Sequence, residues 1–392
     1  MKVQLALASL FLGAFAVGTT EFVPAGLVPA ISGDLHVSIP TAGLLISAYA
    51  AGVAIGGPIL SLMTSRFPRK PMILSLMGLF FLGHVFAALA PDFTTLMLAR
   101  IVISLSHGSY FGLMAIIATS LVPPERHGLA LAFTFGGISV ANVLGVPLGT
   151  AIGDAFGWRA TFWIVGSIGI VAALAMLAFV PKDAAHREEH ASMAAQFRVL
   201  GNPQVYMTYI MIIVMMVGFF GLVTFVSPWL TQVGGVPSGF VPWALLLFGV
   251  ASVISILVGG RLNDSYPNQT LLFSFAFWAF AFALALLAPG NPVLAVVALF
   301  VIGLTNINNA ALQTRILRGA ADAPDLASTL ISSVYNTGIA VGAYLAAAAL
   351  EQGIGYAQIP WFGVVFSAAA GIICALTLAS ERRKRLAIAS AA

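Results

Sequence analysis

Gly18-Thr19-Thr20-Glu21-Phe22-Val23-Pro24 lies inside the first long apolar run of the chain, from about residue 3 to residue 31. Within that run Glu21 is the only charged residue. A carboxylate in hydrocarbon is costly unless it is protonated, paired or hydrated, so an acid placed there marks a functional site by default. We therefore predict that the rest of the chain gives Glu21 a partner and a route to water on both sides of a membrane.

The composition is that of an integral membrane protein. Of the 392 residues, 60% are apolar and only 8% are charged, whereas a soluble domain carries roughly 25% charged residues. The basic residues behind the net charge of +4 lie in short loops, so no nucleic-acid partner is indicated. Cys374 is the single cysteine, which leaves no disulfide framework and no metal-type Cys/His spacing. The first run is too long for a signal peptide and holds Glu21 and Pro24, so we expect it to be retained.

Twelve apolar runs are long enough to be membrane spans, because a helix needs about 20 such residues to cross the hydrocarbon. The fold class is therefore all-α, with twelve transmembrane helices. Turn residues such as Phe67-Pro68-Arg69 and Pro289-Gly290-Asn291-Pro292 separate the runs. The predicted spans are roughly 4–30, 41–63, 71–90, 94–120, 129–153, 160–181, 204–230, 240–259, 270–288, 292–314, 326–350 and 360–380.

The basic residues predict that both termini are cytoplasmic, because inside loops are enriched in Lys and Arg. In that orientation the outside loops hold only Arg159. The inside loops hold Arg66, Arg69, Lys70, Arg126, Lys182, Arg187, Arg198, Arg261, Arg315 and Arg318, and the C-terminal tail adds Arg382-Arg383-Lys384-Arg385.

The longest polar stretch divides the chain into two halves of six spans each. We predict an N-terminal six-helix bundle over 1–181, a cytoplasmic linker over 182–203, and a C-terminal six-helix bundle with a basic tail over 204–392. The halves repeat, because the loops after spans two and eight align proline on proline. Two such halves around a midplane site are a transporter architecture, in which one half rocks against the other.

The loop after span two resembles the signature Gly-x-x-x-Asp-Arg-x-Gly-Arg-Lys/Arg of the major facilitator superfamily. Arg66, Arg69 and Lys70 match it, whereas Ser61, Ser65 and Pro68 replace Gly, Asp and Gly. The copy after span eight keeps Gly260 and Asp264 and lacks the basic end. The resemblance implies a loop that gates the cytoplasmic side through charge pairing, which the missing acid at Ser65 weakens.

Span five carries a glycine repeat at Gly145, Gly149 and Gly153, with Pro147 between them. Glycines four residues apart allow close helix approach, and proline kinks a helix. This span resembles the antiporter motif of the drug:proton antiporter branch of the superfamily. That resemblance implies closure of the outer side, and ordinary glycine-mediated packing is the alternative.

The chain resembles bacterial sugar-efflux and chloramphenicol-efflux members of that branch. The similarity is carried by residues 18–27, by Ser106-His107, and by residues 145–149 followed by 156–162. It implies export of a substrate in exchange for protons, from a monomer in the bacterial inner (cytoplasmic) membrane.

Glu21 and Arg100 are predicted to lie at a similar depth. With a rise of 1.5 Å per residue, Glu21 is about 25 Å from the cytoplasmic end of span one, and Arg100 is about 21 Å from the inner end of span four. An arginine beside the carboxylate would keep it ionised, whereas burial alone favours the neutral acid. We predict that this pair loads and releases a proton; a static buried ion pair is the alternative.

His107 lies two turns further along span four, where a histidine relays protons, binds a polar substrate or only packs. His84, on span three, is a weaker candidate, because that span packs at the periphery in this family. The second half offers amides and hydroxyls, which must face another helix or a watery cavity. Its aromatic rings either line that cavity or face lipid. The predicted substrate contacts are Glu21, His107, Tyr110, Thr224, Asn306, Asn309, Tyr335 and Asn336.

These features predict a proton-coupled antiporter that exports a small neutral or weakly polar solute, either a drug such as chloramphenicol or a sugar. The expected energy source is an ion gradient or the gradient of the substrate itself, because the sequence has no ATP-binding loop. No cofactor or metal is expected, and the lipid bilayer is the other partner. The alternatives are an uncoupled facilitator or an importer of a sugar or nucleoside. A membrane sensor or an intramembrane enzyme has no metal or nucleophile motif to support it.

Overall fold

The computed structural model describes residues 2–64, 67–182, 201–320 and 324–391. Among these residues, twelve helical segments are long and apolar enough to cross a membrane, which confirms the predicted span count and the all-α fold class. The orientation with both termini in the cytoplasm stays a prediction.

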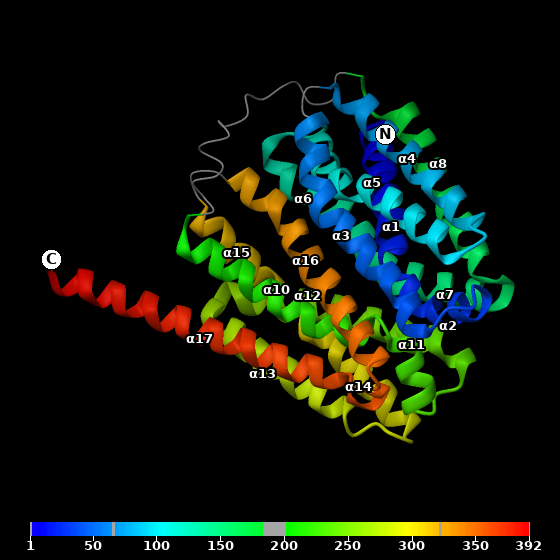
Figure 1. Ribbon diagram of the computed structural model, residues 1–392. Helices are drawn as coiled ribbons and strands as arrows, with labels where there is room; N and C mark the ends of the chain where they lie inside the picture. Colours follow the sequence, from blue (N-terminus) through cyan, green and yellow to red (C-terminus); the bar gives the residue numbers. More distant parts are fainter. Residues whose placement is uncertain (1, 65–66, 183–200, 321–323, 392) are drawn as a thin grey trace.

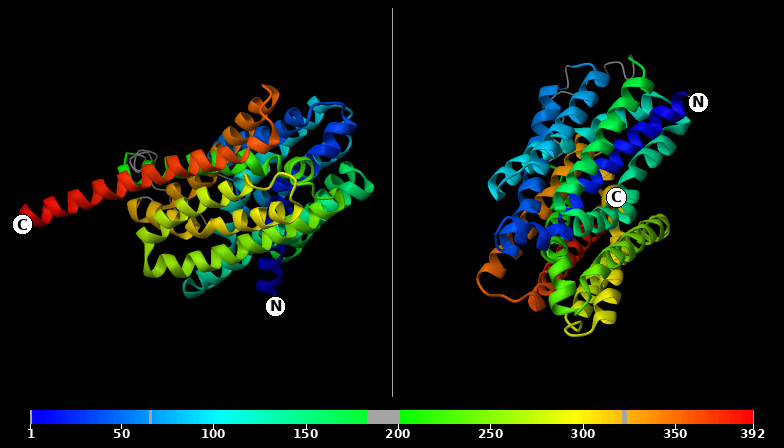
Figure 2. Two further views of the ribbon diagram at one scale, coloured as in Figure 1. Left: turned by 90° about the horizontal axis from the view of Figure 1, so that it is seen from below. Right: turned by 90° about the vertical axis from the view of Figure 1, so that its right-hand side faces the viewer.

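The first half consists of α1 (Lys2–Phe22), α2 (Pro24–Asp34), α3 (Ile39–Thr64), α4 (Arg69–Ala88), α5 (Phe93–Ser120), α6 (His127–Val140), α7 (Val146–Phe156) and α8 (Trp158–Phe179). The second half consists of α10 (Pro203–Val223), α11 (Val226–Pro228), α12 (Val241–Ser265), α13 (Pro267–Ala285), α14 (Pro292–Gly303), α15 (Asn309–Gly319), α16 (Pro324–Glu351) and α17 (Pro360–Ala391). Figure 1 shows the two halves as two bundles, and α17 extends beyond its bundle toward the C-terminus, as the left view of Figure 2 also shows.

Several predicted spans are interrupted, and proline accounts for two of the breaks. The first run breaks at Val23, between α1 and α2, because Pro24 has no N–H to continue the helical hydrogen bonds. In span five, a π-helical turn over Ala141–Gly145 precedes Pro147 and joins α6 to α7. Span ten narrows to a 3₁₀ segment, Leu304–Asn308, between α14 and α15. These irregular turns fall within spans, where backbone groups must find partners inside the protein.

Each half has its own hydrophobic core. One cluster is drawn from α1, α2, α3, α4, α5 and α8, around residues such as Leu10, Phe80 and Phe162. The other is drawn mainly from the second half, and residues of the first half, Ile46 and Ala25 among them, join it. The predicted domain boundaries at 181 and 204 stay a prediction, since most of the linker lies outside the described residues.

The halves are joined at the end of the molecule that holds α2 and α11, here called the α2–α11 end (Figure 1). On α3, Ser47 donates a hydrogen bond to the Ala340 carbonyl of α16 at 2.8 Å. Nearer the tip, Thr41 donates to the Glu351 carboxylate at 3.2 Å. The chain termini lie apart from each other and from this end (Figure 1). The described polar contacts therefore place the junction of the two halves toward one side of the molecule.

Apolar contacts reinforce the α2–α11 end. The rings of Phe22 and Phe220 stack across the two halves with their centroids 6.0 Å apart. Gly43 of α3 lies directly against Phe225, such that a Cβ added at Gly43 would meet the ring at 2.5 Å. This close approach requires glycine at position 43.

Candidate functional site

Glu21 is the penultimate residue of α1 and is partly exposed. Among the described residues, no hydrogen bond or ion pair involves its carboxylate. The next residue, Phe22, stacks on Phe220 of the second half, and Ala25, four residues on, belongs to the hydrophobic cluster of the second half. Glu21 therefore lies where α1 meets the boundary between the two halves.

Arg100 lies on α5 and is fully buried. Its Nη1 donates to the Thr20 backbone carbonyl at 2.7 Å and to the Thr20 hydroxyl at 3.2 Å. In a regular helix the N–H of residue 24 would bond that same carbonyl. Position 24 is a proline without an N–H, so the helix break leaves the Thr20 oxygen free to accept from the guanidinium.

In this conformation Arg100 contacts Thr20 rather than the carboxylate of Glu21. Arg100 binds the residue before the acid, and the described residues contain no ion pair between the two side chains within 4.0 Å. Two other guanidinium nitrogens of Arg100, Nε and Nη2, are buried with no hydrogen-bond partner. Arg100 is therefore held one residue from Glu21, and two of its nitrogens can still donate hydrogen bonds. Its role in proton coupling stays a prediction.

Tyr49 of α3 supports the other side of the guanidinium. The Arg100 Cζ atom lies 4.0 Å from the centre of the Tyr49 ring, a cation–π contact. The Tyr49 hydroxyl is 3.0 Å from Nδ1 of His107, which is almost fully buried on α5. His107 therefore connects to the Arg100 site through Tyr49, and its predicted part in proton transfer or substrate binding stays a prediction.

His84 of α4 joins the same group of side chains. Its Nε2 lies 2.9 Å from the Thr20 hydroxyl, and its Nδ1 lies 2.8 Å from the Phe80 carbonyl. Sequence reasoning gave this histidine little weight, because span three was expected at the periphery. The available signal was its position in an apolar run, where a polar side chain must find a partner.

Tyr110, predicted to contact substrate, is fully buried in this conformation. Its hydroxyl donates to the Leu10 carbonyl of α1 at 2.8 Å, and a Cβ added at Gly13 would lie 2.1 Å from that hydroxyl oxygen. Tyr110 thus ties α5 to α1 here, and contact with substrate stays a prediction.

The predicted polar residues of the second half lie on three different spans. Asn306 lies inside the irregular turn of span ten, and Asn309 directly follows it and accepts a hydrogen bond from Gln313 at 2.7 Å. Asn336 of α16 donates to Ser332, while its Oδ1 is buried without a partner. The remaining two are the partly buried Tyr335 and the fully buried Thr224, whose hydroxyl also lacks a partner.

The span-five glycines meet α1 and α2 in register. Cβ atoms added at Gly145, Gly149 and Gly153 would collide with Thr19, Val23 and Leu27, respectively, at 2.1, 2.6 and 2.2 Å. Both sets are spaced by four residues, so one helix presents a ridge and the other a groove. The helices therefore approach each other closely at these glycines, and closure of the outer side stays a prediction.

The predicted cytoplasmic gating loops are only partly described. Arg66 lies outside the described residues. Lys70 donates to the carbonyls of Leu177 and Val180 at 2.7 and 2.5 Å, and so caps the end of α8. In the described part of the chain, neither Arg69 nor the exposed Asp264 forms an ion pair, and Gly260 has open space beside it.

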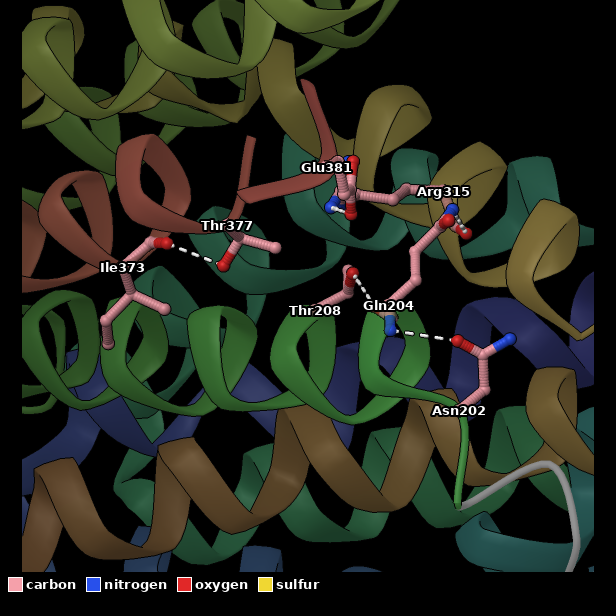
Figure 3. Close-up of polar contacts among 7 residues, drawn as sticks. All are labelled: Asn202, Gln204, Thr208, Arg315, Ile373, Thr377 and Glu381. Carbon is pink, nitrogen blue, oxygen red and sulfur yellow. Dashed lines mark hydrogen bonds and ion pairs between the residues drawn. The ribbon is translucent and has the colours of Figure 1, made fainter. Parts of the chain in front are cut away.

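Sequence reasoning missed a buried charge in the second half, because it placed Arg315 in a loop. Arg315 lies in α15, is 8% exposed and forms an ion pair with Glu381 of α17 (Figure 3). Its backbone carbonyl accepts from Gln204 of α10 at 2.9 Å. The pair therefore links three helices of this bundle.

At the end of α2, Asp34 forms an ion pair with Arg159 and accepts a hydrogen bond from Trp158 Nε1 at 3.0 Å. The hydrogen bond from Arg159, followed by that from Trp158, lowers the pKa of the Asp34 carboxyl below its ordinary value. This contact fixes the end of α2 to the start of α8.

Comparison with known proteins identifies the family. The model of the Major Facilitator Superfamily matches residues 10–306. The chain belongs to this superfamily. It is 36% identical over 386 residues to the inner membrane transport protein YdhP of Escherichia coli K12, with 98% of each chain covered. It is 32% identical over 381 residues to a chloramphenicol resistance protein of Streptomyces lividans, with 96% of this chain and 95% of that one covered.

A solved structure supports the fold independently. The chain superposes with a TM-score of 0.79 on a bacterial homologue of the human lysosomal transporter Spinster, described as inward-facing and unoccupied, at 17% identity and with 96% of each chain covered. Family membership confirms that this protein is a transporter rather than an enzyme. The twelve spans and relatives named as inner membrane transport proteins confirm the predicted multi-pass inner-membrane location.

Proposed function

We propose that this protein is a proton-coupled antiporter that exports a small neutral or weakly polar organic solute. The observation that carries the proposal is Glu21, a partly exposed acid with no bonded partner, at the boundary between two bundles and one residue from the site of Arg100. An intramembrane carboxylate must be protonated, paired or hydrated. Rocking of the halves changes which of these conditions it meets, and this couples proton binding to the conformation.

The chemistry of the second half favours an uncharged substrate. Its buried polar groups include amides and hydroxyls, Thr224 and Asn336 among them, and each of these two has an oxygen without a partner. Arg315 is already neutralised by Glu381. Neutral donors and acceptors suit a molecule such as chloramphenicol, and a relative at 32% identity is named a chloramphenicol resistance protein.

The test uses purified protein in proteoliposomes with an acidic lumen and radiolabelled chloramphenicol outside. We expect uptake that exceeds equilibration and collapses when a protonophore is added. Glu21→Gln abolishes this accumulation, because a neutral amide cannot bind and release a proton, whereas Glu125→Gln, a change at an exposed loop acid, leaves it intact.

Two outcomes contradict the proposal. Accumulation by Glu21→Gln equal to that of the parent would remove Glu21 from the mechanism. Flux that ignores the proton gradient would select an uncoupled facilitator or an importer. A resistance panel in a strain without its own efflux pumps extends the test to other neutral drugs and to sugars.

A further inference from the structure

We infer that His84 is a positioning residue: through the Thr20 hydroxyl it sets how firmly Arg100 is held away from Glu21. The inference rests on the proposed function, in which Glu21 carries the proton. It starts from a continuous set of contacts that runs from the Phe80 carbonyl through His84 and Thr20 to Arg100.

The donor and acceptor roles along this set of contacts follow from its first member. A carbonyl oxygen only accepts, so Nδ1 of His84 carries the hydrogen that bonds Phe80. In the neutral imidazole Nε2 is then an acceptor, and the Thr20 hydroxyl donates to it. The lone pairs of that hydroxyl are left for Arg100 Nη1, which can only donate. His84 therefore turns the Thr20 hydroxyl into an acceptor for the cation.

The surroundings make this orientation firm. Thr20 and His84 are each 1% exposed, so water does not compete for either group. The His84 ring lies 4.1 Å from the Phe80 ring, centre to centre, and its Cβ blocks the space beside Gly166 of α8. The ring is thus held between α4 and α8, and it cannot swing away from Thr20 without repacking both helices.

The consequence for Glu21 follows from how the guanidinium divides its hydrogen bonds. Arg100 is held by Thr20 at Nη1 and by the Tyr49 ring at one face, while Nε and Nη2 stay unpartnered. Losing the hydroxyl contact loosens the cation and frees it to turn toward the carboxylate. A closer arginine favours the ionised acid, so Glu21 would hold its proton only in more acidic solution.

The titratable and charged side chains that face this site come from each helix packed around it. They are Glu21 of α1, Tyr49 of α3, His84 of α4, and Arg100 and His107 of α5; from α8 the neighbour is the uncharged Phe162 ring. His107 is hydrogen-bonded to Tyr49, whose ring lies against Arg100, so a change at Thr20 leaves that side of the cation in place.

The experiment measures protonation of Glu21 without a transported substrate. Dicyclohexylcarbodiimide labels protonated carboxyls in apolar surroundings, and mass spectrometry of the peptide that bears Glu21 gives the labelled fraction against pH. For Thr20→Val and for His84→Leu we expect the pH of half-maximal labelling to fall by about one unit. The double variant should shift no further than Thr20→Val, because the hydrogen bond that His84→Leu removes is already absent without the Thr20 hydroxyl.

Controls separate positioning from general disturbance. Thr20→Ser keeps the hydroxyl and should match the parent. Thr134→Val removes a buried hydroxyl that bonds only within its own helix, to Ala130 and Leu131, and should also match. If His84→Leu fails to fold, Thr20→Val alone decides the question.

An unchanged or raised labelling midpoint in Thr20→Val would overturn the inference, as would an equal shift in Thr134→Val. Such results leave the proposed function standing, because that depends on whether Glu21→Gln still accumulates chloramphenicol under a proton gradient. The two ideas therefore fail on different measurements.

Discussion

Adding one methyl group at Gly43 should weaken the α2–α11 end. A Cβ there would lie 2.5 Å from both Cε1 and Cζ of Phe225, closer than atoms of this kind approach. Phe225 is fully buried against Tyr356, with 6.3 Å between ring centres, so it has little room to yield. Overpacking of this kind costs about 1–3 kcal/mol.

That cost applies only while the halves touch at Gly43, so Gly43→Ala should favour conformations in which this end is separated. A difference of about 1–3 kcal/mol shifts a two-state equilibrium by about 5–150-fold. The higher helix propensity of alanine is common to both conformations and cancels. Gly78→Ala, at a helical glycine with open space beside it, is the matched control.

The assay is distance measurement between spin labels by pulsed electron resonance in nanodiscs. Cysteines replace Gly33 and Gly239, which lie in the first and second halves and have open space beside them. Cys374, the single native cysteine, is replaced by serine. We expect Gly43→Ala to populate longer distances and Phe225→Leu to reverse part of the change. A distance distribution that superimposes on that of Gly78→Ala would refute the reasoning.

Further predictions concern three other contacts. Glu381→Gln leaves Arg315 buried without its counter-ion. Because Glu381 is 29% exposed, we expect the free energy of unfolding to fall by about 2 kcal/mol rather than by the full cost of a deeply buried pair. The Tm in detergent should fall accordingly, and a second change, Arg315→Met, should restore part of it. Asp34→Asn should lower Tm at neutral pH. The lowered pKa of Asp34 means that its contribution is present above the ordinary carboxyl value of about 3.9 and disappears as the pH falls through the folded value, so the Tm difference from the parent should vanish in acid. Gly145→Val should reduce accumulation of chloramphenicol at least tenfold, because it drives α1 from the span-five helix; unchanged accumulation at equal expression would contradict this.

The spans were predictable because the bilayer dictates their length and composition. Residues 94–120, for example, match α5 (Phe93–Ser120) almost to the residue. The breaks at Pro24 and Pro147 were also encoded locally, since a missing N–H acts through its own turn of helix. Span ten extended further than expected, to Gly319, because the ion pair with Glu381 lets Arg315 stay inside the bundle.

The candidate site was only half predictable. Rise per residue placed Glu21 and Arg100 at one depth, but it says nothing of rotation about the helix axes, which decides that Arg100 meets Thr20 instead. The partners of Lys70 and His84 are backbone carbonyls and a hydroxyl, groups that every helix offers. Such contacts leave no mark in the sequence beyond the presence of a polar side chain in an apolar run.

The modest bonding across the α2–α11 end bears on how the transporter changes shape. The hydrogen bonds of Ser47 to Ala340 and of Thr41 to Glu351 are each worth about 0.5–1.5 kcal/mol net. Their sum is comparable to the difference in binding energy that a single bound solute or proton supplies between two conformations. The polar contacts at this end therefore do not lock the two halves together, and binding of a solute or a proton is enough to shift the balance between the empty and the loaded conformation.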